Sequence, residues 1–242
     1  MNAWAGLSSP AAAKDRWRVV CGLAACAAAG ASLIGLHDPL ASMTDYTAAL
    51  MALNQLAPPL LLLAIPHSRQ NPPLRLKFLR PVTDWLLDPW VAGVVFTMVT
   101  IGISLPEIFE PALANALFAA PLGLLEFGAG LLLWAQILPS SSRFEHDRSA
   151  GLFAIAMGVP MTVVAVVWMT SPHVLYSPYL NVLCLWNLTP LEDQRWSGFV
   201  MLILGVPMQL RGVWLLALPD RRRSGTVMPA PADDRGRTSR GE

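Results

Sequence analysis

About six apolar segments, most of them near the length of a membrane-spanning helix, limit the folds open to this chain more than any other feature. A helix needs about 20 apolar residues to cross the hydrocarbon core of a bilayer. The chain is 54% hydrophobic and only 14% charged, whereas soluble domains carry about 25% charged residues. The sequence therefore predicts an all-α polytopic membrane helix bundle. The predicted segments are residues 17–36, 46–65, 90–105, 112–138, 150–170 and 196–218.

The distribution of Lys and Arg predicts the orientation of these segments. Basic residues precede the first segment, fill the loop 66–89, follow the fourth segment and follow the last one. The loops 37–45 and 106–111 contain no Lys or Arg, and the loop 171–195 contains only Arg195. Because cytoplasmic loops are enriched in Lys and Arg, this pattern predicts about six transmembrane helices with both termini in the cytoplasm.

The domain organisation follows from this topology. It comprises a cytoplasmic N-terminus (1–16), a transmembrane domain (17–218) with a cytoplasmic loop (66–89) and a periplasmic loop (171–195), and a disordered cytoplasmic tail (219–242). The tail is predicted to be disordered because Arg, Asp, Ser, Gly and Pro dominate it.

Composition and motifs exclude several classes of function. The net charge is +1 and the basic residues are spread over short loops and the tail, which argues against nucleic-acid binding. Cys21, Cys26 and Cys184 form no disulfide framework or zinc-type spacing. No nucleophile elbow or phosphate-cradling glycine loop occurs, so we do not expect an enzyme.

Two ionisable residues, Glu126 and Arg211, fall inside predicted spans, where charge is costly. Counted from the outer ends of the fourth and sixth segments, both lie roughly 21 to 23 Å deep. We therefore expect them to form an intramembrane pair. The open interpretations are a structural pair, separate satisfaction with Arg211 reaching the cytoplasmic face, and a proton relay. Asn54 and Gln55 are expected to form interhelical hydrogen bonds.

The stretch 171–210 combines a loop rich in Pro and aromatic residues, an acidic cluster and an apolar run. Pro190 suits the first turn of a helix, so a helix is predicted to start there. Glu192 and Asp193 favour the positive end of its dipole, and partner recognition is their second interpretation. The residues singled out here and on the preceding helix are Pro160, Met161, Thr162, Tyr176, Tyr179, Leu191, Glu192, Asp193, Gln194 and Gly198.

These residues carry a family resemblance. The S-P-x-x-L-Y-x-x-Y loop, the L-E-D-Q cluster with Gly198, and the Pro160-Met161-Thr162 run resemble the multi-pass CtaG family of bacterial cytochrome c oxidase assembly proteins, over roughly residues 17–218. The resemblance implies a protein of the bacterial inner membrane that contacts cytochrome oxidase subunits. It further implies a role in assembling a haem-copper oxidase or maturing its copper.

Copper enters only through this resemblance. Family members carry histidines in the second matched helix, just before an A-P-P-L-L stretch, and two histidines at i and i+4 can hold one metal ion. Here Tyr46 and Leu50 stand at those positions. The remaining metal candidates are the thioethers of Met157, Met161 and Met201, which suit Cu(I), although methionine at helical spacing more often serves packing.

The predicted function, which rests on the resemblance, is therefore a CtaG-like membrane protein that assists the assembly or the copper maturation of a haem-copper cytochrome c oxidase. A scaffold without its own metal site is one form that this role can take. Two alternatives stay open. One is a small transporter or channel that uses the polar groups and proline kinks of the spans. The other is a membrane scaffold for a different partner.

Overall fold

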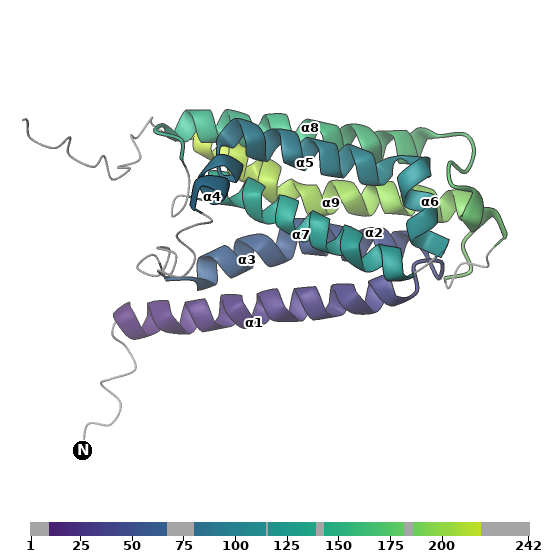
Figure 1. The fold of residues 1–242 in the computed structure, drawn as a ribbon, viewed down its shortest axis with the longest axis horizontal. Helices are drawn as coiled ribbons and strands as arrows, with labels where there is room; N and C mark the ends of the chain where they lie inside the picture. The colour runs from purple at the N-terminus through teal and green to yellow at the C-terminus, as the bar shows by residue number, and fades with distance from the viewer. Residues whose placement is uncertain (1–9, 67–79, 115, 139–142, 182–185, 219–242) are drawn as a thin grey trace, which may run out of the picture.

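The computed structural model describes residues 10–66, 80–114, 116–138, 143–181 and 186–218, and the regular elements within these ranges are helices. The long helices lie side by side in a bundle, with α1 along one edge and α8 along the opposite edge (Figure 1). In chain order the elements are α1 (Pro10–His37), α2 (Met43–Met51), the π-helical turn η2 (Ala52–Leu56), α3 (Ala57–Ala64), α4 (Arg80–Leu86), α5 (Pro89–Ser104), α6 (Pro106–Ala114), α7 (Ala116–Ile137), α8 (Asp147–Thr170), the 3-10 helix η5 (Ser177–Asn181) and α9 (Pro190–Ala217).

The prediction of an all-α polytopic membrane bundle is confirmed. Among the described residues, five helices are long and apolar enough to cross a membrane: Ala13–His37, Met43–Ala64, Ala119–Ile137, Asp147–Thr170 and Pro190–Ala217. The third predicted segment is α5, an apolar helix of 16 residues. At 1.5 Å per residue it is roughly 24 Å long, which is shorter than the hydrocarbon core of about 30 Å. It packs against α7 and α8.

Several predicted boundaries differ from the structure. The segment 106–111, predicted as a loop, lies in α6, where Pro106 takes the first position and Glu107 the first turn. Both residues favour a helix start. The sixth span begins at Pro190, as the local start signals predict, and therefore earlier than the apolar run at 196. The predicted tail (219–242) lies outside the described residues.

The second span is interrupted by a π-helical turn, Ala52–Leu56. Pro58 and Pro59 follow it and cannot donate backbone hydrogen bonds to the carbonyls four residues earlier. The wider π turn accommodates this loss. It also brings the Asn54 carbonyl against Gly130 of α7, where a Cβ atom would collide with that oxygen.

Helices α8 and α9 pack closely because small residues recur on their facing sides. A Cβ atom on Gly151 would lie 2.8 Å from the Gly212 carbonyl oxygen, and one on Gly198 would lie 2.6 Å from the Ala165 carbonyl oxygen. Close approach through small residues is a common way for helices to associate in a membrane. The glycines on the contact recur at intervals of seven: Gly151 and Gly158 on α8, and Gly198, Gly205 and Gly212 on α9.

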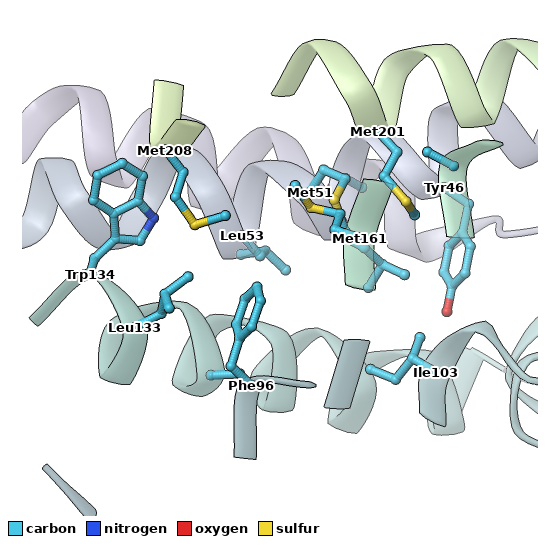
Figure 2. Close-up of a cluster of buried hydrophobic side chains, with 14 of the residues drawn as sticks. Tyr46, Met51, Leu53, Phe96, Ile103, Leu133, Trp134, Met161, Met201 and Met208 are labelled. Atoms are coloured by element: carbon cyan, nitrogen blue, oxygen red, sulfur yellow. The ribbon is translucent and has the colours of Figure 1, made fainter. Parts of the chain in front are cut away.

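The interior of the bundle is filled by large apolar side chains from the surrounding helices. Among the described residues, five buried methionines contribute to it, two of them from α9. Figure 2 shows four of the five with aromatic and aliphatic neighbours: Met51, Leu53, Phe96, Leu133, Trp134, Met161, Met201 and Met208.

The close contact of α8 with α9 can be tested with a matched pair of glycine substitutions. Gly198→Ala places a methyl group against the Ala165 carbonyl. We expect the free energy of unfolding to fall by about 1–3 kcal/mol, which lowers the Tm of the detergent-purified protein by roughly 2–10 °C. The control is Gly30→Ala, since no atom lies within 4 Å of a Cβ at Gly30. Its Tm should stay the same or rise slightly, because Ala favours helix. Equal effects of the two substitutions would contradict the packing.

Candidate functional site

The motif residues of the loop 171–189 and of the start of α9 gather at one end of the bundle, called here the loop end, where α6, η5 and the starts of α2 and α9 lie (Figure 1). Asp193 in the first turn of α9 holds the start of α2. Its carboxylate accepts hydrogen bonds from Ser42 Oγ (2.9 Å), Met43 N (2.7 Å), Thr44 N (3.1 Å) and Thr44 Oγ1 (2.6 Å), and the residue is 2% exposed. The first N–H groups of a helix have no partner within it and carry its positive end. Asp193 therefore caps α2 with a buried negative charge.

Gln194, the next residue, anchors the loop between α8 and α9. Its Oε1 accepts a hydrogen bond from Leu175 N at 2.7 Å, and its Nε2 donates to the Trp168 carbonyl at 3.2 Å. Gln194 is fully buried, so both bonds form away from water. The start of α9 is thereby joined to the last turns of α8 and to the loop that follows.

The two loop tyrosines are buried anchors. The Tyr176 hydroxyl donates to the Ser104 carbonyl at 2.8 Å, and the ring centres of Tyr176 and Phe109 lie 4.6 Å apart. Burial raises the pKa of Tyr176 above its ordinary value. Tyr179 donates to the Pro39 carbonyl at 2.7 Å. The loop is thus fastened to α5, α6 and the α1–α2 connection.

Glu192 completes a capping box at the start of α9. Thr189 N donates to Glu192 Oε2 at 2.9 Å, and Glu192 N donates to Thr189 Oγ1 at 3.3 Å. Glu192 thus caps its own helix, α9, whereas the neighbouring Asp193 caps α2. Gly198, one turn further along α9, lies in the contact with α8, and Leu191 is half-buried.

Burial separates most of the motif from the surface that a partner would contact. Asp193, Gln194, Gly198, Tyr176 and Tyr179 are buried, whereas Glu192 is exposed. A partner at the loop end would contact exposed apolar side chains: Leu180 (58% exposed), Trp186 (62%) and Trp196 (51%). The buried motif residues therefore support this end of the molecule from beneath its surface.

The Pro160-Met161-Thr162 run lies in the middle of α8. Met161 is buried, and its terminal methyl group fills the space beside Gly205 of α9. Thr162 Oγ1 donates to the Gly158 carbonyl at 2.9 Å, one turn earlier on α8. Met161 therefore helps to pack α8 against α9, whereas the exposed Thr162 bonds within its own helix.

The three methionines considered for copper have different neighbours. Met157 Sδ lies 3.8 Å from Thr97 Oγ1 on α5, whereas Met161 faces α9 as described above. Met201 lines a small cavity beside Glu126. These contacts thus involve different elements for each of the three methionines, although Met161 and Met201 belong to the same buried cluster. Within the described ranges, no group of three or more His, Cys, Asp or Glu side chains could hold a metal ion.

Glu126 is 1% exposed and pairs with an amide rather than with the predicted arginine. Asn54 Nδ2 donates to Glu126 Oε2 and, at 3.3 Å, to the Glu126 carbonyl oxygen, while Gln55 Nε2 donates to Asn54 Oδ1 at 2.5 Å. Met201 is the α9 residue beside Glu126, and Arg211 lies about ten residues, or about 15 Å, further along that helix. The structure does not bring Glu126 and Arg211 to one depth.

The error in the predicted pair comes from the helix starts. The depths were counted from residues 112 and 196, but α7 begins at Ala116 and α9 at Pro190. Glu126 is therefore nearer to the start of its helix than predicted, and Arg211 is further from the start of its helix. Together the two differences separate the depths of these residues by about ten positions, roughly 15 Å. Sequence reasoning also missed Met51, which lines the cavity with Met201 and directly precedes the π turn.

Comparison with known proteins gives one match. A family model described as "Cytochrome c oxidase caa3 assembly factor (Caa3_CtaG)" matches residues 5–221. No curated protein and no solved structure matches the chain.

The capping role of Asp193 can be tested with two substitutions that each remove one negative charge. Asp193→Asn replaces one carboxylate oxygen with an NH2 group, a donor that faces the donors of Ser42, Met43 and Thr44. We therefore expect the free energy of unfolding to fall by about 2–3 kcal/mol. Thermal unfolding and amide hydrogen exchange at the start of α2 report it. Glu192→Gln is the control, because Gln also completes a capping box, and it should leave the Tm and the protection of α2 nearly unchanged. Protection of α2 that is unchanged in Asp193→Asn would refute the capping role.

Proposed function

The chain belongs to the Caa3_CtaG family of cytochrome c oxidase caa3 assembly factors, and from this premise we propose that it assists oxidase assembly as a membrane scaffold rather than as an enzyme. The observation that carries the proposal is the construction of the loop end. Buried hydrogen bonds of Asp193, Gln194 and Tyr176 hold α2, α5, α8 and α9 in one arrangement there. A surface held rigid before binding loses little conformational entropy on contact with a partner.

The proposed contact surface is the exposed part of the loop end. Leu180 and Trp186 are exposed on the loop, and Trp196 packs edge-to-face on Phe199 with ring centres 5.6 Å apart. The last two border a groove of about 280 Å³ together with Met169, Glu192 and Arg195. Tryptophan and arginine are enriched among the residues that contribute most to the binding energy of protein interfaces. The proposed occupant is a membrane-embedded subunit of a caa3-type oxidase.

Orientation and location are part of the same proposal. The distribution of Lys and Arg favours a periplasmic loop end and cytoplasmic termini in a bacterial inner membrane. In that orientation the scaffold would meet the oxidase subunit at the outer surface of the bilayer.

The second span supports a scaffold without a metal site of its own. Tyr46 and Leu50, which stand at the family's histidine positions, are both buried. The Tyr46 ring lies 5.3 Å from that of Phe109, and Leu50 lines the cavity beside Glu126. A phenol and an aliphatic side chain fill the space where an imidazole pair would bind copper.

The contact surface can be tested by site-specific photo-crosslinking in cells that assemble a caa3-type oxidase. A photoreactive residue at position 180 or 186 should form a cross-link to an oxidase subunit, identified by mass spectrometry. The control is position 90, where Trp90 is 82% exposed at the start of α5, away from the loop end. Cross-links to the oxidase from position 90 and not from 180 or 186 would overturn the proposed surface.

Copper loading separates a scaffold from a metal carrier. After anaerobic loading with Cu(I), the purified protein should hold less than one copper per chain, and Met157→Leu/Met161→Leu should hold the same amount, because these thioethers serve packing. Stoichiometric copper that is lost in the double variant would replace the scaffold mechanism with metal delivery. Loss of assembled oxidase on deletion of the gene, measured by haem a absorbance, tests the assembly role separately from either mechanism.

A further inference from the structure

Among the described residues, three buried hydroxyl groups have no hydrogen-bond partner, and they belong to Tyr46, Thr47 and Thr100. Thr47 on α2 is 1% exposed and Thr100 on α5 is 3% exposed, and the Oγ1 atom of each lacks a partner. Leaving a buried polar group unpaired is costly, and more than nine in ten such groups in proteins are paired. In the core of a bilayer no bulk solvent is present to satisfy them.

Both threonines line one small cavity, and Glu126 of α7 lines it as well. The cavity has a volume of about 10 Å³, which is close to the minimum for one water molecule. A buried water also needs two to four polar partners, and two hydroxyls and a carboxyl group supply that number. The rest of the lining is largely apolar and includes Met51 and Met201.

We propose that this cavity is a binding site for a single water molecule, which bridges Thr47 Oγ1, Thr100 Oγ1 and the Glu126 carboxyl group. Asn54 Nδ2 already donates to Glu126 Oε2, but a carboxyl group has about four acceptor positions and can also bond to the water. The water joins α5 to α2 and α7 in the apolar core. It satisfies polar groups that the surrounding helices leave unpaired.

The position of the site follows from the break in the second span. The π turn, Ala52–Leu56, places Asn54 against Glu126, so the carboxyl group is held at the level of Thr47 and Thr100. A small monovalent cation is the other occupant that oxygen atoms of this kind bind. The Ser104 hydroxyl also lines the cavity, but it already donates to the Thr100 carbonyl. The carboxyl group and the two threonine hydroxyls suit the two to four bonds of a water molecule. The inference is independent of the proposed role in oxidase assembly.

The test replaces each hydroxyl with a methyl group. If a water is bound, Thr47→Val and Thr100→Val should each lower the Tm by roughly 2–6 °C, while Thr47→Ser and Thr100→Ser, which keep the hydroxyl, should lower it less. Because both hydroxyls bind the same water, the double Val variant should lose less than the sum of the single losses. The control is Thr170→Val, since the exposed Thr170 hydroxyl bonds to the Val166 carbonyl of its own helix. Val variants that match or exceed the wild-type Tm would show a dry cavity and overturn the proposal.

A second measurement detects the water directly. Radiolysis produces hydroxyl radicals from bound water in place, so Met201 should be oxidised rapidly although it is buried. Met208, also buried on α9 but away from the cavity, is the control. The rate at Met201 should fall to that of Met208 in the double Val variant. A Tm that rises with NaCl but not with choline chloride at equal ionic strength would assign the cavity to a cation and overturn the water.

Discussion

The cap that Asp193 places on α2 is the interaction on which the loop end depends. A carboxylate that is 2% exposed is stable only when several donors surround it, and Ser42, Met43 and Thr44 supply them. These donors belong to the first turn of a helix whose dipole favours the negative charge. The buried carboxylate is stabilised by the donors at the start of α2, and the N–H groups of that helix start are in turn satisfied by the carboxylate. Gln194 and the loop tyrosines then have fixed positions to bond to.

Local signals predicted the elements better than the contacts between them. Pro190, Glu192 and the apolar run after them indicate a helix start that depends only on neighbouring residues, and the structure has it. The partner of Asp193 lies 150 residues earlier in the chain, and no local pattern encodes that pairing. The sequence predicts a loop where α6 lies, because the start signals Pro106 and Glu107 precede a segment too short to show a clear helical periodicity of apolar residues.

Inside the membrane, too, the sequence predicted the helices better than the contacts between them, although one of those contacts could have been predicted. The depth of Glu126 could not be inferred from the edge of an apolar segment, because α7 and α9 begin at points that hydropathy does not mark. The contact of α8 with α9 was readable, since glycines at 198, 205 and 212 repeat every seven residues and lie on one face. The orphaned hydroxyls of Thr47 and Thr100 belong to different helices, so their meeting needed coordinates.

The π turn in the second span, Ala52–Leu56, changes how the chain around it can vary. A π turn contains one residue more than the α-helical turn that it replaces, so it acts as an insertion within a helix. Residues before and after it no longer share the faces that a count of 3.6 per turn assigns to them. Removing one residue there would turn everything on α2 by about 100° relative to α3. Tyr46 and Thr47 would then leave the interior, so the length of this turn matters as much as its side chains.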